Sequence, residues 1–84
     1  MSLYALQKLL RDVNRTPECR AAYFEAREQF TDRYDLTADE RDDLLQFQVG
    51  RLYRRGVHGL LLRPFTIIHS MPEAEYLRAI RGED

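Results

Sequence analysis

The sequence predicts an all-α fold, a compact orthogonal bundle of about five short helices. Apolar residues recur at three- and four-residue steps through most of the chain, and helix-capping residues precede several of these periods. No segment shows the period-two alternation of apolar and polar residues that marks a half-buried strand. The chain of 84 residues is long enough for one helical domain, residues 1–84, with a small hydrophobic core.

The first two predicted helices start near Leu3 and Pro17. From Leu3 to Val13, apolar side chains fall on one face of the predicted helix. Thr16 offers a hydroxyl cap, and Pro17 suits the first helical position because no amide hydrogen is needed there. The second helix is expected to bury a single stripe, made of Cys19, Tyr23, Ala26, Phe30 and Tyr34.

The third predicted helix starts at Ala38 behind a capping box. The Thr37 side chain can accept a hydrogen bond from the Glu40 amide, while the Glu40 carboxylate reaches back to the Thr37 amide. Gly56 is expected to end this helix as a left-handed cap. Gly50 costs about 1 kcal/mol relative to alanine, which close packing against another backbone would explain. The expected inward positions are Leu44, Leu45, Val49, Leu52 and Tyr53.

The last two predicted helices start near Val57 and Met71. Pro64 has no amide hydrogen and disfavours a helical conformation at Arg63, so a break or bend is expected at that point. Residues 70–73, Ser-Met-Pro-Glu, provide the start signal of the final helix.

The charge balance argues against polyanionic partners. The 14 acidic and 13 basic residues nearly cancel, so no long-range field draws the chain to nucleic acid or to an anionic membrane. The arginines at the end of the third helix favour a solvated face over a phosphate-binding patch, because acidic residues crowd the start of that helix. No apolar run of the sequence, including residues 60–62, approaches the roughly 20 residues that cross a bilayer. We therefore expect neither nucleic acid nor membrane as a partner.

The sequence offers no complete set of catalytic or metal-binding groups. Cys19 is the single cysteine and the N-terminus lacks the layout of a signal peptide, so a cytoplasmic location is expected. His58 and His69 do not share ligand spacing with each other or with Cys19. No catalytic residue, metal ligand or cofactor is therefore predicted in this chain. The favoured interpretation of His58 is a residue past a helix stop that bonds free carbonyls.

The run after Gly59 is apolar on every side and predicts a partner-facing surface or active-site lid. Consecutive helical residues are about 100° apart, so the apolar side chains of this run cannot all point into one small core. The candidate residues are Leu60, Leu61, Phe65, Ile67 and Ile68, bracketed by His58 and His69 as polar contacts. A large exposed apolar patch usually marks an interaction site.

Several segments resemble a known family in their order and spacing. These are Tyr-Asp-Leu-Thr-Ala-Asp-Glu at 34–40, Leu-Leu at 44–45, Leu-Tyr-Arg-Arg-Gly-Val-His-Gly-Leu-Leu at 52–61 and Ser-Met-Pro-Glu-Ala-Glu-Tyr at 70–76. Together they resemble the all-helical small (alpha) subunit, LigA-like, of the protocatechuate 4,5-dioxygenase type (LigAB) of extradiol ring-cleavage dioxygenases. The likeness runs from about Arg20 to Gly82.

The resemblance implies a non-catalytic subunit of an enzyme of aromatic compound catabolism. In that family Fe(II) and its ligands, two histidines and one carboxylate, belong to the large (beta) subunit, and the small subunit lies over the mouth of the site. Such a ligand set leaves iron positions open for a catechol or 2-aminophenol ring and dioxygen, and a lid can exclude water. The family's protocatechuate enzymes have an N-terminal extension and a longer connection before the last helix, in place of which this chain has only Phe65–His69. Many relatives also carry an acidic residue where this chain has Gln48.

Two interpretations stay open. The chain is a small subunit that covers the active site of an iron-bearing large subunit, or it is a free-standing helical interaction module or homodimer without a dioxygenase partner. A neighbouring gene for the large subunit would favour the first, and its absence the second. We do not expect the chain to be an enzyme by itself, because that requires a convergent polar site.

Overall fold

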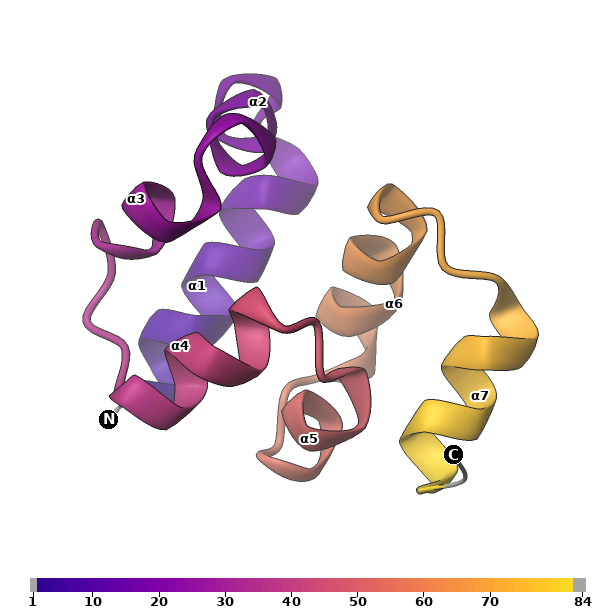
Figure 1. Ribbon diagram of the computed structural model, residues 1–84. Coiled ribbons are helices and arrows are strands. Elements are labelled where there is room, and N and C mark those ends of the chain that lie inside the picture. The colour runs from indigo at the N-terminus through magenta and orange to yellow at the C-terminus, as the bar shows by residue number, and fades with distance from the viewer. Residues whose placement is uncertain (1, 83–84) are drawn as a thin grey trace.

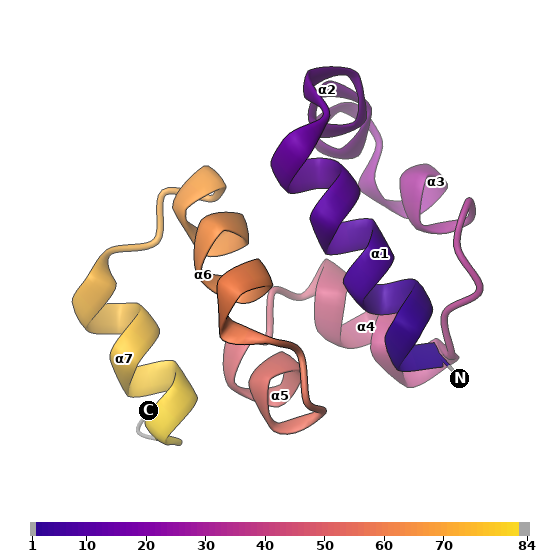
Figure 2. The ribbon, with the colours of Figure 1, turned by 180° about the vertical axis from the view of Figure 1, so that it is seen from behind.

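A computed structural model describes residues 2–82, and these residues form seven helices and no strand. In order they are α1 (Ser2–Arg15), α2 (Pro17–Glu25), α3 (Arg27–Thr31), α4 (Ala38–Leu45), α5 (Val49–Arg54), α6 (Gly59–Ile68) and α7 (Glu73–Arg81). The predicted all-α class is confirmed, with two helices more than the five expected. In both views α6 lies between α1 and α7, and α7 forms one edge of the molecule (Figures 1 and 2).

The core draws on all seven helices. α1 packs against α2 and α6, and α5 packs against α4, α6 and α7. The buried apolar side chains are Leu6, Leu9, Leu10, Val13, Tyr23, Phe30, Leu44, Val49, Leu52, Val57, Leu62, Phe65 and Tyr76. Burial of these side chains is the main source of stability for helices that are each too short to persist alone.

The second predicted helix is wrong as a single element, because the chain turns at Ala26. Ala26 has φ −151° and ψ 79°, although its amide still bonds the Ala22 carbonyl. In a straight helix, Tyr23 and Phe30 would lie about 10 Å apart along the axis. Here their ring centroids are 5.9 Å apart. The turn therefore lets both buried rings enter one core.

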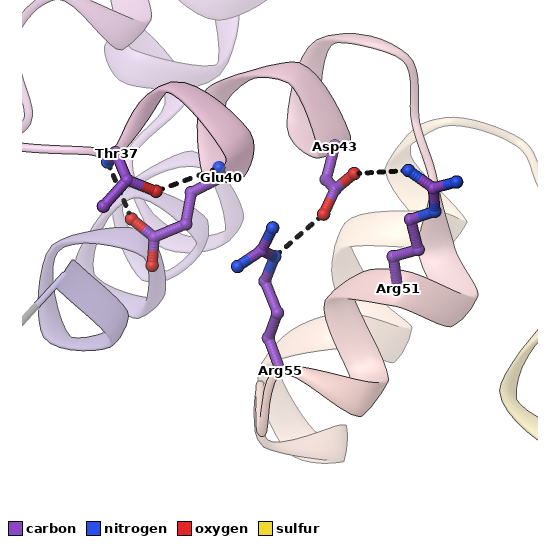
Figure 3. Close-up of polar contacts among 5 residues, drawn as sticks. All are labelled: Thr37, Glu40, Asp43, Arg51 and Arg55. Carbon is purple, nitrogen blue, oxygen red and sulfur yellow. Dashed lines mark hydrogen bonds and ion pairs between the residues drawn. The ribbon is translucent and has the colours of Figure 1, made fainter.

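The capping box at the start of α4 is confirmed. The Glu40 amide donates to Thr37 Oγ1 at 3.1 Å, and the Thr37 amide donates to Glu40 Oε1 at 2.9 Å (Figure 3). Thr16, the residue before α2, forms no such side-chain bond. The two threonines thus occupy equivalent positions with different hydrogen bonding.

We expect Thr37→Ala to lower the free energy of unfolding by about 1 kcal/mol, because the Glu40 amide loses its partner. Denaturant unfolding should show a lower midpoint with an unchanged slope. Thr16→Ala is the matched control and should shift the midpoint much less, since its side chain caps nothing. Equal shifts in the two variants would contradict this assignment.

The third predicted helix is divided at Phe47. The Gln48 amide bonds the Asp43 carbonyl at 2.8 Å, and the Phe47 amide bonds the Leu44 carbonyl at 3.1 Å. This pattern closes α4 with Phe47 in the left-handed region, at φ 54°. Such a φ is strained for a bulky residue. The stacking of its ring on His69, with centroids 4.1 Å apart, holds Phe47 in place.

Gly56 ends α5 as predicted. Its φ is 104°, and the Val57 amide bonds the Leu52 carbonyl at 3.3 Å across the stop. Tyr53 was expected to point inward but is 43% exposed, because α5 buries the side that carries Val49 and Leu52.

Gly50 also packs as expected. A Cβ at this position would lie 2.6 Å from the Ala79 carbonyl oxygen of α7. The backbones of α5 and α7 are therefore in direct contact.

A break or bend was expected at Pro64; the helix does not break there, because α6 runs through it from Gly59 to Ile68. Proline lacks the amide that would bond the Leu60 carbonyl, but Leu60 is 80% exposed, so water can reach this end of the helix. Ser70, at φ 63°, closes α6 rather than starting the next helix. α7 follows Pro72, which makes no side-chain cap.

Candidate functional site

α6 presents an exposed apolar face. Leu60 and Ile67 are seven residues apart and share this face, on which they are 80% and 57% exposed. Pro64 lies between them and is also exposed. We call these three residues the α6 stripe. Leu61 and Ile68 are partly buried beside it and pack against the core.

Phe65 does not belong to this surface, so its predicted partner-facing role is wrong. Its side chain is fully buried. The ring lies 5.5 Å from that of Tyr23 and 4.8 Å from that of His69, centroid to centroid. Phe65 and Leu62 are three residues apart and share the inner face of α6. The apolar residues of this helix therefore fall into a buried set on the inner face and the exposed α6 stripe.

His58 is the N-cap of α6. Its Nδ1 accepts a hydrogen bond from the Leu60 amide at 3.1 Å, and its own amide donates to Gln7 Oε1 at 2.9 Å. The ring thus bonds an amide of the following helix, and not free carbonyls of the preceding one as expected. Because Nδ1 accepts, the hydrogen of the neutral ring is on Nε2, and the side chain is exposed.

His69 lies at the other end of α6, within an aromatic cluster. Its Nε2 is 2.8 Å from the Tyr23 hydroxyl oxygen. The Phe24 and Phe47 rings lie 5.1 and 4.1 Å from the imidazole, centroid to centroid, and Phe65 completes the enclosure. We call these five residues the aromatic cluster.

The aromatic cluster keeps its polar pair uncharged at neutral pH. Burial lowers the pKa of His69 to about 4, and the nearby Arg27 guanidinium acts in the same direction. Burial also raises the pKa of Tyr23 to about 12. The Tyr23 and His69 side chains therefore form a hydrogen-bonded pair of neutral groups.

Sequence reasoning missed this enclosure of His69. Tyr23, Phe24 and Phe47 come from α2 and from the turn after α4, far from His69 in the chain. No local spacing connects such residues, and only covariation among related sequences could have done so.

Ion pairs between Asp43 and two arginines connect α4 with α5 and the residue that follows it. The Asp43 carboxylate is buried, accepts a hydrogen bond from Arg55 Nε at 2.8 Å, and lies 3.5 Å from an Arg51 guanidinium nitrogen (Figure 3). These arginines balance a carboxylate of their own chain. The arrangement has a structural role.

Within residues 2–82, no three His, Cys, Asp or Glu side chains gather closely enough to hold a metal ion. His58 and His69 cap opposite ends of α6. The same range contains no helix with the length and hydropathy needed to cross a bilayer.

The fold and the α6 stripe define a small all-α domain with an exposed apolar helix face. Comparison of the chain with protein-family models, curated proteins and solved structures found no match.

Proposed function

We propose that this chain is a LigA-like, non-catalytic small subunit of an extradiol dioxygenase that opens a catechol or 2-aminophenol ring. The proposal takes its partner from the resemblance in residues 34–61 and 70–76. The observation that carries it is the α6 stripe, which gives this small domain an apolar surface for a larger protein to cover.

Docking through the α6 stripe is energetically reasonable. Burying an exposed leucine or isoleucine contributes about 1.5–3 kcal/mol, and Leu60 and Ile67 lie on one face of one helix. The helix is held at its N-terminus by the His58 cap and at its C-terminus by the packing of His69. A rigid helix face loses little conformational freedom on association.

In the proposed complex, Fe(II) held by the large subunit supplies the ring-opening chemistry. This chain covers the mouth of that site and excludes water. His58 and His69 lie at the two ends of α6. The exposed His58 imidazole can meet a ring hydroxyl or a partner carboxylate, whereas His69 Nε2 is already bonded to the Tyr23 hydroxyl.

The test is co-expression with an iron-bearing large subunit encoded beside this chain, followed by co-purification and catechol turnover. Leu60→Glu and Ile67→Glu are each expected to abolish association, because a carboxylate would be buried without a partner. Both variants should keep the helical circular dichroism spectrum, since the replaced side chains are exposed. Tyr53→Glu is the control, because Tyr53 is an exposed aromatic residue on α5 and should leave association intact.

The same stripe also favours the second candidate, a homodimer or interaction module. In that case the isolated chain self-associates, Leu60→Glu makes it monomeric, and the large subunit does not co-purify. Failure of the wild-type chain to associate with the large subunit would overturn the dioxygenase proposal. Stoichiometric iron and ring cleavage in the isolated chain would overturn its non-catalytic role.

A further inference from the structure

A groove of about 570 Å³ lies along α1, and Leu61 of α6 contributes to its lining. Tyr4, which is 72% exposed, and Leu61 supply its apolar surface. Two hydrogen bonds join the helices here, from the His58 amide to Gln7 Oε1 and from Asn14 Nδ2 to the Leu61 carbonyl, each 2.9 Å long. The groove is therefore preformed, and filling it requires little reordering of the chain.

The charge of this groove differs from that of the whole chain. Lys8, Arg11 and Arg15 line it with a single acidic residue, Asp12, whereas the whole chain has a net charge of −1. One oxygen of Asp12, Oδ2, already accepts hydrogen bonds from the Tyr34 hydroxyl at 2.6 Å and from Lys8 Nζ at 3.2 Å. Arg11 and Arg15 are exposed and form no ion pair with residues 2–82. Two guanidinium groups are thus available to an external anion.

The spacing of these two arginines suits paired carboxylates. Arg11 and Arg15 are four residues apart on α1, about 6 Å along the helix axis. Acidic residues four apart on a helix, or two apart on an extended segment, have about the same spacing. Each guanidinium group can bind a carboxylate through two parallel hydrogen bonds.

We propose that this groove binds an acidic segment of a protein partner. Two carboxylates of the segment pair with Arg11 and Arg15, and an apolar side chain packs on Tyr4 and Leu61. A protein fits better than a nucleic acid, because the groove has an apolar surface beside its cations and the nearly balanced charge of the chain gives no long-range attraction to an extended polyanion. The inference rests on the proposed function only in taking the partner to be a protein, and its test requires no dioxygenase.

The test begins with selection of a random-peptide library on the immobilised full chain. We expect enrichment of peptides that carry two acidic residues and an apolar side chain. The affinity of an enriched, dye-labelled peptide is then measured by fluorescence anisotropy. Arg11→Gln/Arg15→Gln should weaken binding by at least about tenfold, because both charge-assisted contacts are lost. Arg78→Gln/Arg81→Gln neutralises two exposed arginines of α7 and should retain the wild-type affinity.

Several outcomes would overturn the inference. One is an absence of enriched peptides, or enrichment without an acidic preference. Another is an equal loss of affinity in the two double variants, which would indicate a response to overall charge. Tighter binding of a single-stranded oligonucleotide or of phosphatidylserine vesicles than of the peptide would also overturn it. If peptide binding behaves as expected while the large subunit does not associate, the dioxygenase proposal fails and the inference stands.

Discussion

Replacing Phe65 with alanine is expected to lower the free energy of unfolding by about 3–5 kcal/mol. The ring is fully buried in the aromatic cluster, so its loss removes apolar contacts and leaves a cavity that the surrounding helices can only partly fill. The whole stability of a small domain is about 5–15 kcal/mol, so this loss is a large fraction of it. Chemical denaturation followed by circular dichroism would measure the change.

Leu60→Ala is the matched control for Phe65→Ala, since both residues belong to one apolar helix. Leu60 is 80% exposed, and its truncation should change the free energy of unfolding by no more than about 0.5 kcal/mol. The sequence assigned both residues to a partner-facing surface, whereas the structure separates them. Similar losses of stability in the two variants would show that this separation is wrong.

Acidification is expected to destabilise the fold through His69. Its pKa is about 4 in the folded chain, below the ordinary value of 6.5. As the pH falls below 6.5, the unfolded chain binds a proton at His69 and the folded chain does not, so stability is lost progressively down to about pH 4. His69 contributes no pH dependence above this window. Solvent screens part of the effect of the lowered pKa, because the ring is only partly buried. We therefore expect a loss of about 2 kcal/mol in the free energy of unfolding.

The contribution of His69 can be isolated with His69→Phe, which keeps an aromatic ring and removes the titration. Unfolding free energies of both proteins would be measured at several values between about pH 7 and pH 4. The wild type should lose stability more steeply than the variant, even though Tyr23 loses its hydrogen-bond partner in the variant at every pH. Parallel pH profiles would contradict a neutral His69 in the folded chain.

The parts of the fold that sequence predicted correctly are fixed by residues close together in the chain. The capping box needs only Thr37 and Glu40, and the stop after α5 needs only a residue that tolerates positive φ, which Gly56 supplies. The close packing at Gly50 was also predicted correctly. Glycine destabilises a helix interior, so its presence there indicated a position at which a side chain would collide with a neighbouring backbone.

The parts that were missed depend on contacts between distant segments. Ala26 carries no breaking signal, and the chain turns there because Tyr23 and Phe30 enter the same core. Phe47 is unfavourable at positive φ and is held there by its contact with His69. For the candidate site, sequence predicted that some apolar side chains of α6 must face outward. Only the packing of the core could show that Leu60 does so and Phe65 does not.

The close spacing of α5 and α7 depends on Gly50 having only a hydrogen atom in place of a side chain, because this residue contacts the Ala79 carbonyl. A side chain at position 50 would force the backbones of α5 and α7 apart. Tyr76, which α7 buries and over whose ring the Arg63 guanidinium lies, would move away from the core with it. Gly50 therefore determines how closely the last helix can approach the core. We expect few other amino acids at this position in related sequences, even though it does not belong to the α6 stripe.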